Sequence, residues 1–329
     1  MEQTKLEKYL ENTLLEKLGN EKGKDYYADY QSARSYLVRN ILPNIKATEP
    51  ELTDHSERHI ENVLKNAWRL LDTDKTKLSE YDIYVLCLSI LLHDVGNING
   101  RKEHNKKVSD IYNAIRNNDS NFNTERALVL KAVKAHCGTT NTGSRDTLAE
   151  VEIIGSLRGE PVQLREIASI LRFADELAEG PQRTSDYLID TDKISDKSKI
   201  YHRYAQITNI FIDRGNERIA LLYHIDTENE TLETFRKLLS FVYERIIKLD
   251  EERRYTKFHS KLLETFKKTE VTFNFMHKGK PLDLTLDKIV LHDTCVIPGD
   301  KQPDITDLVA KFSVLNIDNI IKQLKLKKK

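Results

Sequence analysis

The chain has 329 residues, of which 39% are hydrophobic, enough for a real core in one large domain or two ordinary ones. Its 52 Lys and Arg residues balance 52 Asp and Glu residues, so the formal net charge is zero. This balance removes bulk electrostatics as a reason to expect binding to nucleic acid or to an anionic membrane, and only a local basic patch is left as a route to nucleic acid.

The N-terminal part of the chain is expected to be helical. Leu6, Leu10 and Leu14 recur every four residues, and Gly19 follows as a stop signal. Apolar residues between 26 and 42 predict a second helix that ends before Pro43. A third helix is expected to start near Thr53, a plausible N-cap, and to bury its apolar face.

The most apolar segment of the chain comes next. Ser79 and Asp82 have the spacing of a capping box, and residues 83–92 are almost entirely apolar. A helix that is apolar on all sides is buried on all sides. The predicted helix ends at residues 93–96, with the sequence His-Asp-Val-Gly.

Further helices are predicted around residues 108–115, 124–136 and 162–179. Between the last two, residues 138–161 are polar and predicted to be irregular. After residue 190 the pattern changes: 205–213 and 218–226 predict a β-hairpin, 232–268 a long amphipathic helix, 271–275 and 282–291 further strands, and 305–329 a terminal helix.

These patterns predict a mainly α protein: an all-helical core with a smaller C-terminal α/β appendage. The expected domains are N-terminal helices that pack on the core (1–50), the core itself (51–195) and the appendage (196–329). The low usage of Gly and Pro, 12 and 7 residues, agrees with a helix-rich chain.

Cysteine usage and hydropathy indicate the compartment. The three cysteines, Cys87, Cys137 and Cys295, include no CxxC pair, which excludes a disulfide scaffold and favours a reducing cytoplasm. Residues 1–18 are charged and amphipathic, unlike a signal peptide. No apolar run approaches the roughly 20 residues of a membrane span, so we expect no membrane association.

Histidines and carboxylates on apolar helix faces form the most informative pattern. Five of ten histidines lie between residues 55 and 136, each on or beside a predicted helix. Asp94 closes the most buried helix, and Asp175 shares the apolar face of its own helix with Leu171. A buried carboxylate must be paired or bound to a metal, because desolvating a lone charge costs several kcal/mol.

His59, His93, Asp94 and Asp175 therefore form a candidate metal site on three separate helices. Imidazole and carboxylate ligands suit a divalent ion such as Mn, Fe, Ni, Co or Zn, with Mn as our first expectation. Such an ion acidifies bound water into a nucleophile and neutralises phosphate oxygens.

Residues 91–96, Leu-Leu-His-Asp-Val-Gly, resemble the signature of the HD-domain metal-dependent phosphohydrolases. His59 with Val63 looks like the first histidine of that family, and residues 172–176, Arg-Phe-Ala-Asp-Glu, resemble the segment with its last aspartate. Residues 53–59 and the pair Arg101 and His104 are similar to a bacterial subgroup of stand-alone HD proteins. The resemblance covers roughly residues 50–185.

The resemblance implies an all-helical core and a divalent metal with His59, His93, Asp94 and Asp175 as ligands. His55 is the alternative first ligand, with His59 then behind it. Several HD families add histidines for a second metal or for phosphate contact, and His55, His104 and His136 are the candidates here. Asp94 is also expected to orient the water, and His104 or His136 to protonate the leaving oxygen.

Differences between this sequence and the motifs of known HD subfamilies narrow the choice of reaction. Gly96 and Asn97 replace the Glu-Asp pair of the guanosine-tetraphosphate hydrolases, and Cys137 and Gly138 stand where the cyclic-di-GMP phosphodiesterases carry their Gly-Tyr-Pro segment. The deoxynucleotide triphosphohydrolase pattern is weakened, because residues 97–99 intervene before His104, but it is retained. We therefore expect hydrolysis of a nucleotide phosphoester or phosphoanhydride, with a preference for (deoxy)nucleoside triphosphates.

Two alternatives stay open: a cyclic-nucleotide phosphodiesterase or single-strand nuclease, and a non-catalytic nucleotide-sensing or scaffold module. The expected partner is a nucleotide, nucleic acid is disfavoured, and a homo-oligomer is compatible with the sequence. A second His-Asp pair, His292 and Asp293, follows a predicted strand and lacks partner residues, so we expect no metal there.

Four arginines are candidates for substrate phosphate. Arg101 and Arg183 each follow a helix that carries a metal motif, although a solvated surface arginine is an equal reading. Arg145 and Arg158 lie in the polar stretch 138–161, which begins directly after His136. A long loop inside a compact domain is usually functional or disordered, and we expect this one to close over the nucleotide.

Overall fold

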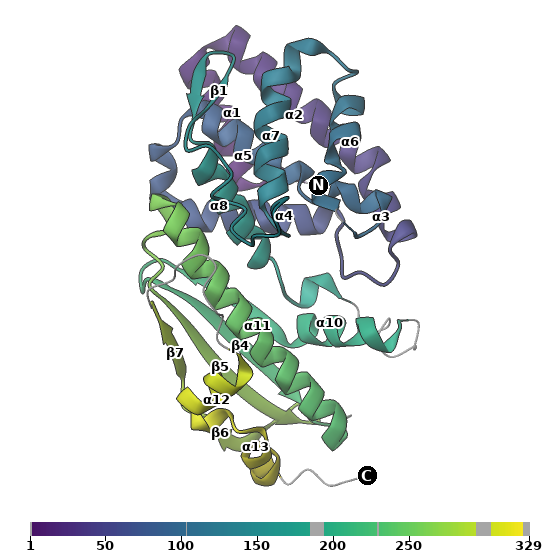
Figure 1. The fold of residues 1–329 in the computed structure, drawn as a ribbon, viewed down its shortest axis with the longest axis vertical. Coiled ribbons are helices and arrows are strands. Elements are labelled where there is room, and N and C mark those ends of the chain that lie inside the picture. Colours follow the sequence, from purple (N-terminus) through teal and green to yellow (C-terminus); the bar gives the residue numbers. More distant parts are fainter. Residues whose placement is uncertain (1, 103, 185–193, 229, 294–303, 325–329) are drawn as a thin grey trace. The chain divides into compact units, whose positions relative to one another are not determined.

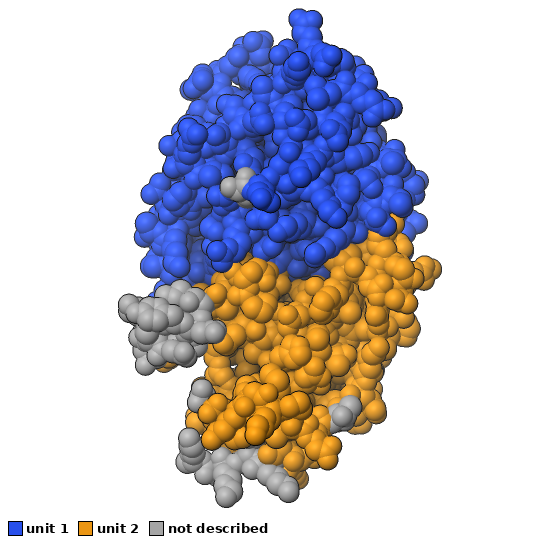
Figure 2. Space-filling model, turned by 180° about the vertical axis from the view of Figure 1, so that it is seen from behind, with its two compact units in different colours: residues 1–178, 256–264 blue, residues 179–255, 265–329 orange. Residues whose placement is uncertain are grey.

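The computed structural model describes residues 2–102, 104–184, 194–228, 230–293 and 304–324 (Figure 1). Internal contacts divide the chain into two compact units, coloured in Figure 2. Unit 1 comprises residues 1–178 and 256–264, and unit 2 comprises residues 179–255 and 265–329. The domain limits expected from the sequence stay a prediction, because this division describes compactness and not independent folding. The two units are described separately.

Unit 1 is helical apart from one small hairpin. Its helices are α1 (Lys5–Leu18), α2 (Asn20–Asn40), α3 (Leu42–Thr48), α4 (Glu57–Leu71), α5 (Glu80–Leu92), α6 (Val108–Ile115), α7 (Asn123–Ala135) and α8 (Leu164–Glu176).

The start and stop signals were only partly right in this unit. Gly19 ends α1, and Ser79 with Asp82 forms the capping box of α5, as predicted. Helix α2 ends at Asn40, before Pro43, as predicted, and the proline lies in the first turn of the next helix, α3, where its missing N–H costs nothing. The N-cap of α4 is Ser56 and not Thr53.

Helix α5 is the core of unit 1. Every residue from Tyr81 to Leu92 is buried, and contacts reach α5 from α1, α2, α4, α7 and α8. The stretch Glu80–Asn99 is long and apolar enough to cross a membrane by length and composition alone, which the sequence analysis had excluded. The most apolar part of this stretch is 94% buried inside the structure, as expected of a core helix.

A buried ionic network lies along the helices beside the N-terminal half of α5. The carboxylate of Glu125 accepts hydrogen bonds from Tyr84 (2.8 Å), Tyr112 (2.6 Å) and Arg116 (2.6 Å). Because Glu125 is fully buried, these donors offset the cost of removing its charge from water. The network joins α5, α6 and α7. It contacts α5 at Tyr84, whereas the His-Asp segment lies at the C-terminal end of that helix.

The stretch 138–161 was predicted to be irregular, and this is wrong for its last part. Strands β1 (Gly155–Leu157) and β2 (Glu160–Val162) form an antiparallel hairpin, so Val162 ends a strand and does not begin α8. The turn residues Arg158 and Gly159 have φ of 52° and 94°, the left-handed conformation of a tight hairpin turn.

Unit 2 contains an α/β fold. Its elements are α10 (Asp196–Ile207), β3 (Thr208–Asp213), β4 (Arg218–Asp226), α11 (Leu232–His259), β5 (Lys268–His277), β6 (Lys280–Thr285), β7 (Ile289–His292), α12 (Ile305–Lys311) and α13 (Ile317–Leu324). The last turn of α11 belongs to unit 1. The expected strand at 205–213 begins only at Thr208, because residues 196–207 are helical. Cys295 and the Lys-rich end lie outside the described residues.

The sheet of unit 2 is mixed. β3 and β4 form the predicted antiparallel hairpin, β4 pairs in parallel with β5, and β5 also pairs with β6 and β7. Helix α11 makes the crossover that a parallel pair requires. Tyr243 of α11 packs on Phe273 of β5, so the helix covers one face of the sheet (Figure 1). The mainly α class with a C-terminal α/β part is confirmed.

Candidate metal centre

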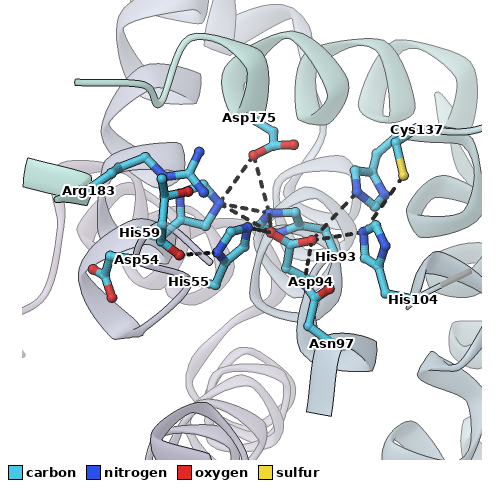
Figure 3. A network of polar contacts seen from close by, with 12 residues as sticks. Asp54, His55, His59, His93, Asp94, Asn97, His104, Cys137, Asp175 and Arg183 are labelled. Atoms are coloured by element: carbon cyan, nitrogen blue, oxygen red, sulfur yellow. Dashed lines mark hydrogen bonds and ion pairs between the residues drawn. The ribbon is translucent and has the colours of Figure 1, made fainter. Parts of the chain in front are cut away.

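Three helices of unit 1 bring the predicted ligands to one point (Figure 3). His59 lies on the buried face of α4, His93 is the C-cap of α5 with Asp94 directly after it, and Asp175 lies in the last turn of α8. One oxygen or nitrogen atom from each of these four residues lies within 4.8 Å of the others. The side chains of both histidines are fully buried, whereas that of Asp175 is 25% exposed.

The distances between these atoms are uniform. Nε2 of His59 lies 3.2 Å from Nε2 of His93, 3.5 Å from Asp94 Oδ2 and 3.2 Å from Asp175 Oδ1. Nε2 of His93 lies 3.3 Å from Asp94 Oδ2 and 3.5 Å from Asp175 Oδ1. Ligands about 2.0–2.1 Å from a tetrahedral ion are separated from one another by about 3.3 Å. The four residues therefore fit a small divalent ion.

Backbone carbonyls orient most of the imidazoles toward this point. Nδ1 of His93 lies 2.8 Å from the carbonyl oxygen of Ile90, and Nδ1 of His136 lies 2.5 Å from that of Val133. His55 and His104 contact the carbonyls of Thr53 and Arg101 in the same way. An Nδ1–H that donates to a carbonyl leaves the Nε2 lone pair free for a metal. His59 differs, because its Nδ1 has no hydrogen-bond partner among the described residues.

The electrostatics of the cluster favour the ionised form of both carboxylates. Burial alone would raise the pKa of Asp94, but the surrounding histidines, with His93 foremost, hold it well below its usual value. The same opposition, again led by His93, holds the pKa of Asp175 well below its usual value. Burial would lower the pKa of His93, and the two carboxylates together raise it well above the ordinary value. Two ionised carboxylates among buried imidazoles form a site that a divalent cation would complete.

Asp94 presents one oxygen to each side of the cluster (Figure 3). Oδ2 faces His59 and His93, and also His55, whose Nε2 lies 3.5 Å away. Oδ1 faces His104 at 3.0 Å and His136 at 4.0 Å, and it accepts a 3.1 Å hydrogen bond from the amide of Asn97. His104, His136 and Cys137 form a second group with ligand atoms within 4.8 Å of one another.

The two candidates for the first ligand are distinguished by this geometry. His59 Nε2 lies within 3.5 Å of all three other members of the main group, whereas His55 Nε2 lies 3.5 Å from Asp94 Oδ2. The geometry favours His59 as the ligand and places His55 behind Asp94. Its functional role stays a prediction.

The four arginines lie in different places. Nη1 of Arg101 is 3.9 Å from Asp94 Oδ1 and 3.4 Å from the side-chain oxygen of Asn97, with a half-exposed side chain. Arg145 is exposed on the loop after His136. Arg183 belongs to unit 2, where it lies 3.7 Å from Glu179. For Arg101, Arg145 and Arg183 the phosphate contact stays a prediction.

Arg158 does not join the cluster. Its guanidinium lies over the rings of Tyr26 (5.0 Å) and Phe122 (5.5 Å), and Tyr26 in turn packs on Tyr81 at the first turn of α5. The His-Asp segment with the candidate ligands follows the last turn of that helix, at its other end. The phosphate contact of Arg158 stays a prediction.

Sequence reasoning missed the residues that hold the site together. Asn97 binds Asp94, Asn66 of α4 binds the carbonyl of Ala174, and Asn105 binds the carbonyls of Lys134 and Cys137. The signal in the sequence was their position, one to seven residues from a predicted ligand, and the structure shows that each asparagine is buried.

Comparison with known protein families identifies the class. The family model HD-CE matches residues 49–251, more than half of the chain, and the chain therefore belongs to the HD-CE family. This match confirms the HD-type resemblance and, together with the buried His and Asp groups, indicates an HD-type hydrolase. No curated protein and no solved structure matches the chain.

Proposed function

We propose that the protein is a metal-dependent phosphohydrolase that hydrolyses a nucleotide phosphoester or phosphoanhydride, with a preference for (deoxy)nucleoside triphosphates. The observation that carries this proposal is the convergence of His59, His93, Asp94 and Asp175, with five interatomic distances between 3.2 and 3.5 Å. Membership of the HD-CE family supports the same class of chemistry.

The four residues would hold a divalent ion, with Mn as the first expectation. When bound, such an ion supplies Lewis-acid chemistry, activating water and neutralising phosphate charge. His59 and His93 contribute neutral nitrogen ligands and the two carboxylates contribute charge. The partial exposure of Asp175 leaves the site open on that side, where substrate would enter.

Residues around the ion would bind and orient the substrate. Arg101 is the best-placed cation, because it already reaches toward Asp94 and its side chain is half exposed. It would pair with a phosphate oxygen, and Arg145 would meet more distant phosphate charge. His104, 3.0 Å from Asp94, and His136 would either protonate the leaving oxygen or hold a second ion.

A nucleotide panel tests this proposal. Purified protein with Mn would be incubated with nucleoside triphosphates, deoxynucleoside triphosphates, cyclic nucleotides and single-stranded oligonucleotides, and the products resolved by mass spectrometry. Loss of phosphate or triphosphate from a nucleotide, abolished by Asp94→Asn, supports it. Cleavage confined to cyclic nucleotides or oligonucleotides would instead assign a phosphodiesterase or a nuclease. Metal binding without turnover of any substrate would leave a sensing or scaffold module.

The proposed setting is the cytoplasm. Cys87 and Cys137 are free thiols, as a reducing compartment permits.

A further inference from the structure

The thiol of Cys137 lies beside the metal centre without a role in the proposed function. Its Sγ is 3.7 Å from Nε2 of His104, and the same Nε2 lies 3.0 Å from Asp94 Oδ1 (Figure 3). His136, the residue before Cys137, is only 4% exposed, and its Nε2 lies 4.0 Å from the same oxygen of Asp94. His104, His136 and Cys137 thus offer ligand atoms within 4.8 Å of one another, and Asp94 Oδ1 lies beside the imidazole of His104.

We propose that Cys137 supplies a thiolate ligand to a second metal ion, which is held together with His104 and His136 and faces Oδ1 of Asp94. This inference rests on the proposed function, because Asp94 would then be shared between two ions. Thiolate is a soft ligand that favours Zn over Mn or Mg, and Co is a spectroscopic substitute for Zn. The two positions of this centre would therefore prefer different metals.

The distance between the thiol and the imidazole of His104 matches such an ion. An ion with metal–sulfur bonds of about 2.3 Å and metal–nitrogen bonds of about 2.0–2.1 Å separates sulfur from nitrogen by about 3.6 Å in tetrahedral geometry. The observed separation between Cys137 and His104 is 3.7 Å. The Nε2 lone pair of His104 faces both the sulfur and Asp94 Oδ1, an arrangement that a shared cation stabilises.

Hydrogen bonds to neighbouring backbone groups fix the orientation of these proposed ligands. Nδ1 of His104 and of His136 each lie against a backbone carbonyl, which directs Nε2 inward. The amide of Asn105 donates to the carbonyls of Lys134 (2.9 Å) and Cys137 (3.2 Å), and so ties the residue after His104 to the end of α7. Outer hydrogen bonds of this kind fix ligand orientation in metal sites.

Cobalt spectroscopy tests the proposal without relying on activity. The full-length protein would be depleted of metal and titrated with Co²⁺, and thiolate-to-cobalt charge-transfer absorption would be followed in the near ultraviolet. We expect this band in the wild-type protein, its loss in Cys137→Ala, and its retention in Cys87→Ala, which removes a fully buried thiol of α5. Zn²⁺ binding to the second position should weaken at least tenfold in Cys137→Ala, with the other position retained.

Alkylation gives a second readout. Iodoacetamide labelling of Cys137, located by mass spectrometry, should slow when Zn²⁺ is bound and should not slow with Mg²⁺. If wild-type protein binds metal but shows no thiolate band and no protection, Cys137 is not a ligand and this inference is wrong while the proposed function stands. If Asp175→Asn leaves all metal binding intact, the main site itself is wrong and the proposed function fails with it.

Discussion

The side-chain amide of Asn66 donates a 3.1 Å hydrogen bond to the backbone carbonyl of Ala174, and this bond joins α4 to the last turn of α8. The carbonyl is among the last four of its helix, which have no partner within the helix. Asn66 lies two turns beyond His59 on α4, and Ala174 directly precedes Asp175. This hydrogen bond therefore ties together the two segments that carry these predicted ligands.

Replacing Asn66 by alanine should destabilise the protein and loosen the metal site. The change leaves a buried carbonyl without a donor, which costs about 1–3 kcal/mol, and it frees Asp175 to move. Urea unfolding and metal titration would measure both effects. Asn62→Ala is the matched control on the same helix, because the amide nitrogen of Asn62 has no hydrogen-bond partner among the described residues. Equal stability of the two variants would contradict this account.

Asp175→Asn should reduce metal content at least tenfold while the fold is kept. The amide has the shape of the carboxylate but lacks its charge, and a neutral oxygen is a weaker ligand for a divalent ion. Elemental analysis of purified protein is the measurement. His292→Ala, an exposed residue of β7 in the second His-Asp pair, is the control and should retain full metal content.

A chelator should lower the melting temperature, and Mn should restore it. Metal that binds only the folded state stabilises it by about 2.7 kcal/mol at a hundredfold excess over the dissociation constant. For a unit of the size of unit 1, this stabilisation corresponds to a rise in melting temperature of roughly 5–11 °C. Calorimetry with and without chelator measures the shift. An unchanged melting temperature in protein that has lost its metal would place the ion outside the buried helices.

Gly96→Ala should displace His104. A Cβ at residue 96 would lie 1.9 Å from the carbonyl oxygen of His104, so the backbone must move. Forced overpacking of this kind typically costs about 1–3 kcal/mol, and it would break the 3.0 Å contact between His104 and Asp94. Urea unfolding and Zn²⁺ titration would report the two effects. Gly215→Ala serves as control, because its nearest neighbour would be 3.7 Å away. A Gly96 variant as stable as the wild type would show that the turn adapts.

Glu270→Gln should destabilise unit 2 at pH 7 and have progressively less effect in acid. Burial would raise the pKa of Glu270, but hydrogen bonds from Lys268, Lys288 and Arg218 together outweigh it and lower the pKa from 4.5 to about 2. Because the folded-state value is depressed, the stabilisation is complete above pH 4.5 and disappears as the pH falls toward 2. Urea unfolding by circular dichroism at pH 7, 4.5 and 3 should show the two proteins converging. A constant difference would assign the effect to packing.

Local signals in the sequence predicted much of the fold. The capping box at Ser79 and the stop at Gly19 are short-range features, so the sequence alone defines α5 and the end of α1. The end of helix α10 was taken for strand because Ala205 and Ile207 are apolar, like much of the strand that follows them. The start of α4 was misplaced because Thr53 and Ser56 are both good caps.

In the candidate site, too, some residues could be predicted from the sequence and others could not. His59, His93, Asp94 and Asp175 could be predicted because each places a polar group on an apolar helix face. The supports could not be predicted: Asn66 reaches a carbonyl 108 residues away, and Asn105 one 32 residues away. Periodicity describes a single helix and contains no information about which distant carbonyl lacks a donor.

The chain enters unit 2 at residue 179, returns to unit 1 for residues 256–264 and leaves it again. In that return, His259 lies 3.0 Å from Asp146, and the backbone N–H of Lys261 donates to Glu166 of α8. A gene fragment that ends near residue 195 would delete both contacts and expose apolar surface now covered by Leu262 and Leu263. The helical core is thus assembled from two separated stretches of the gene. We expect that expression of unit 1 alone requires residues 256–264 to be grafted back or supplied as a separate peptide.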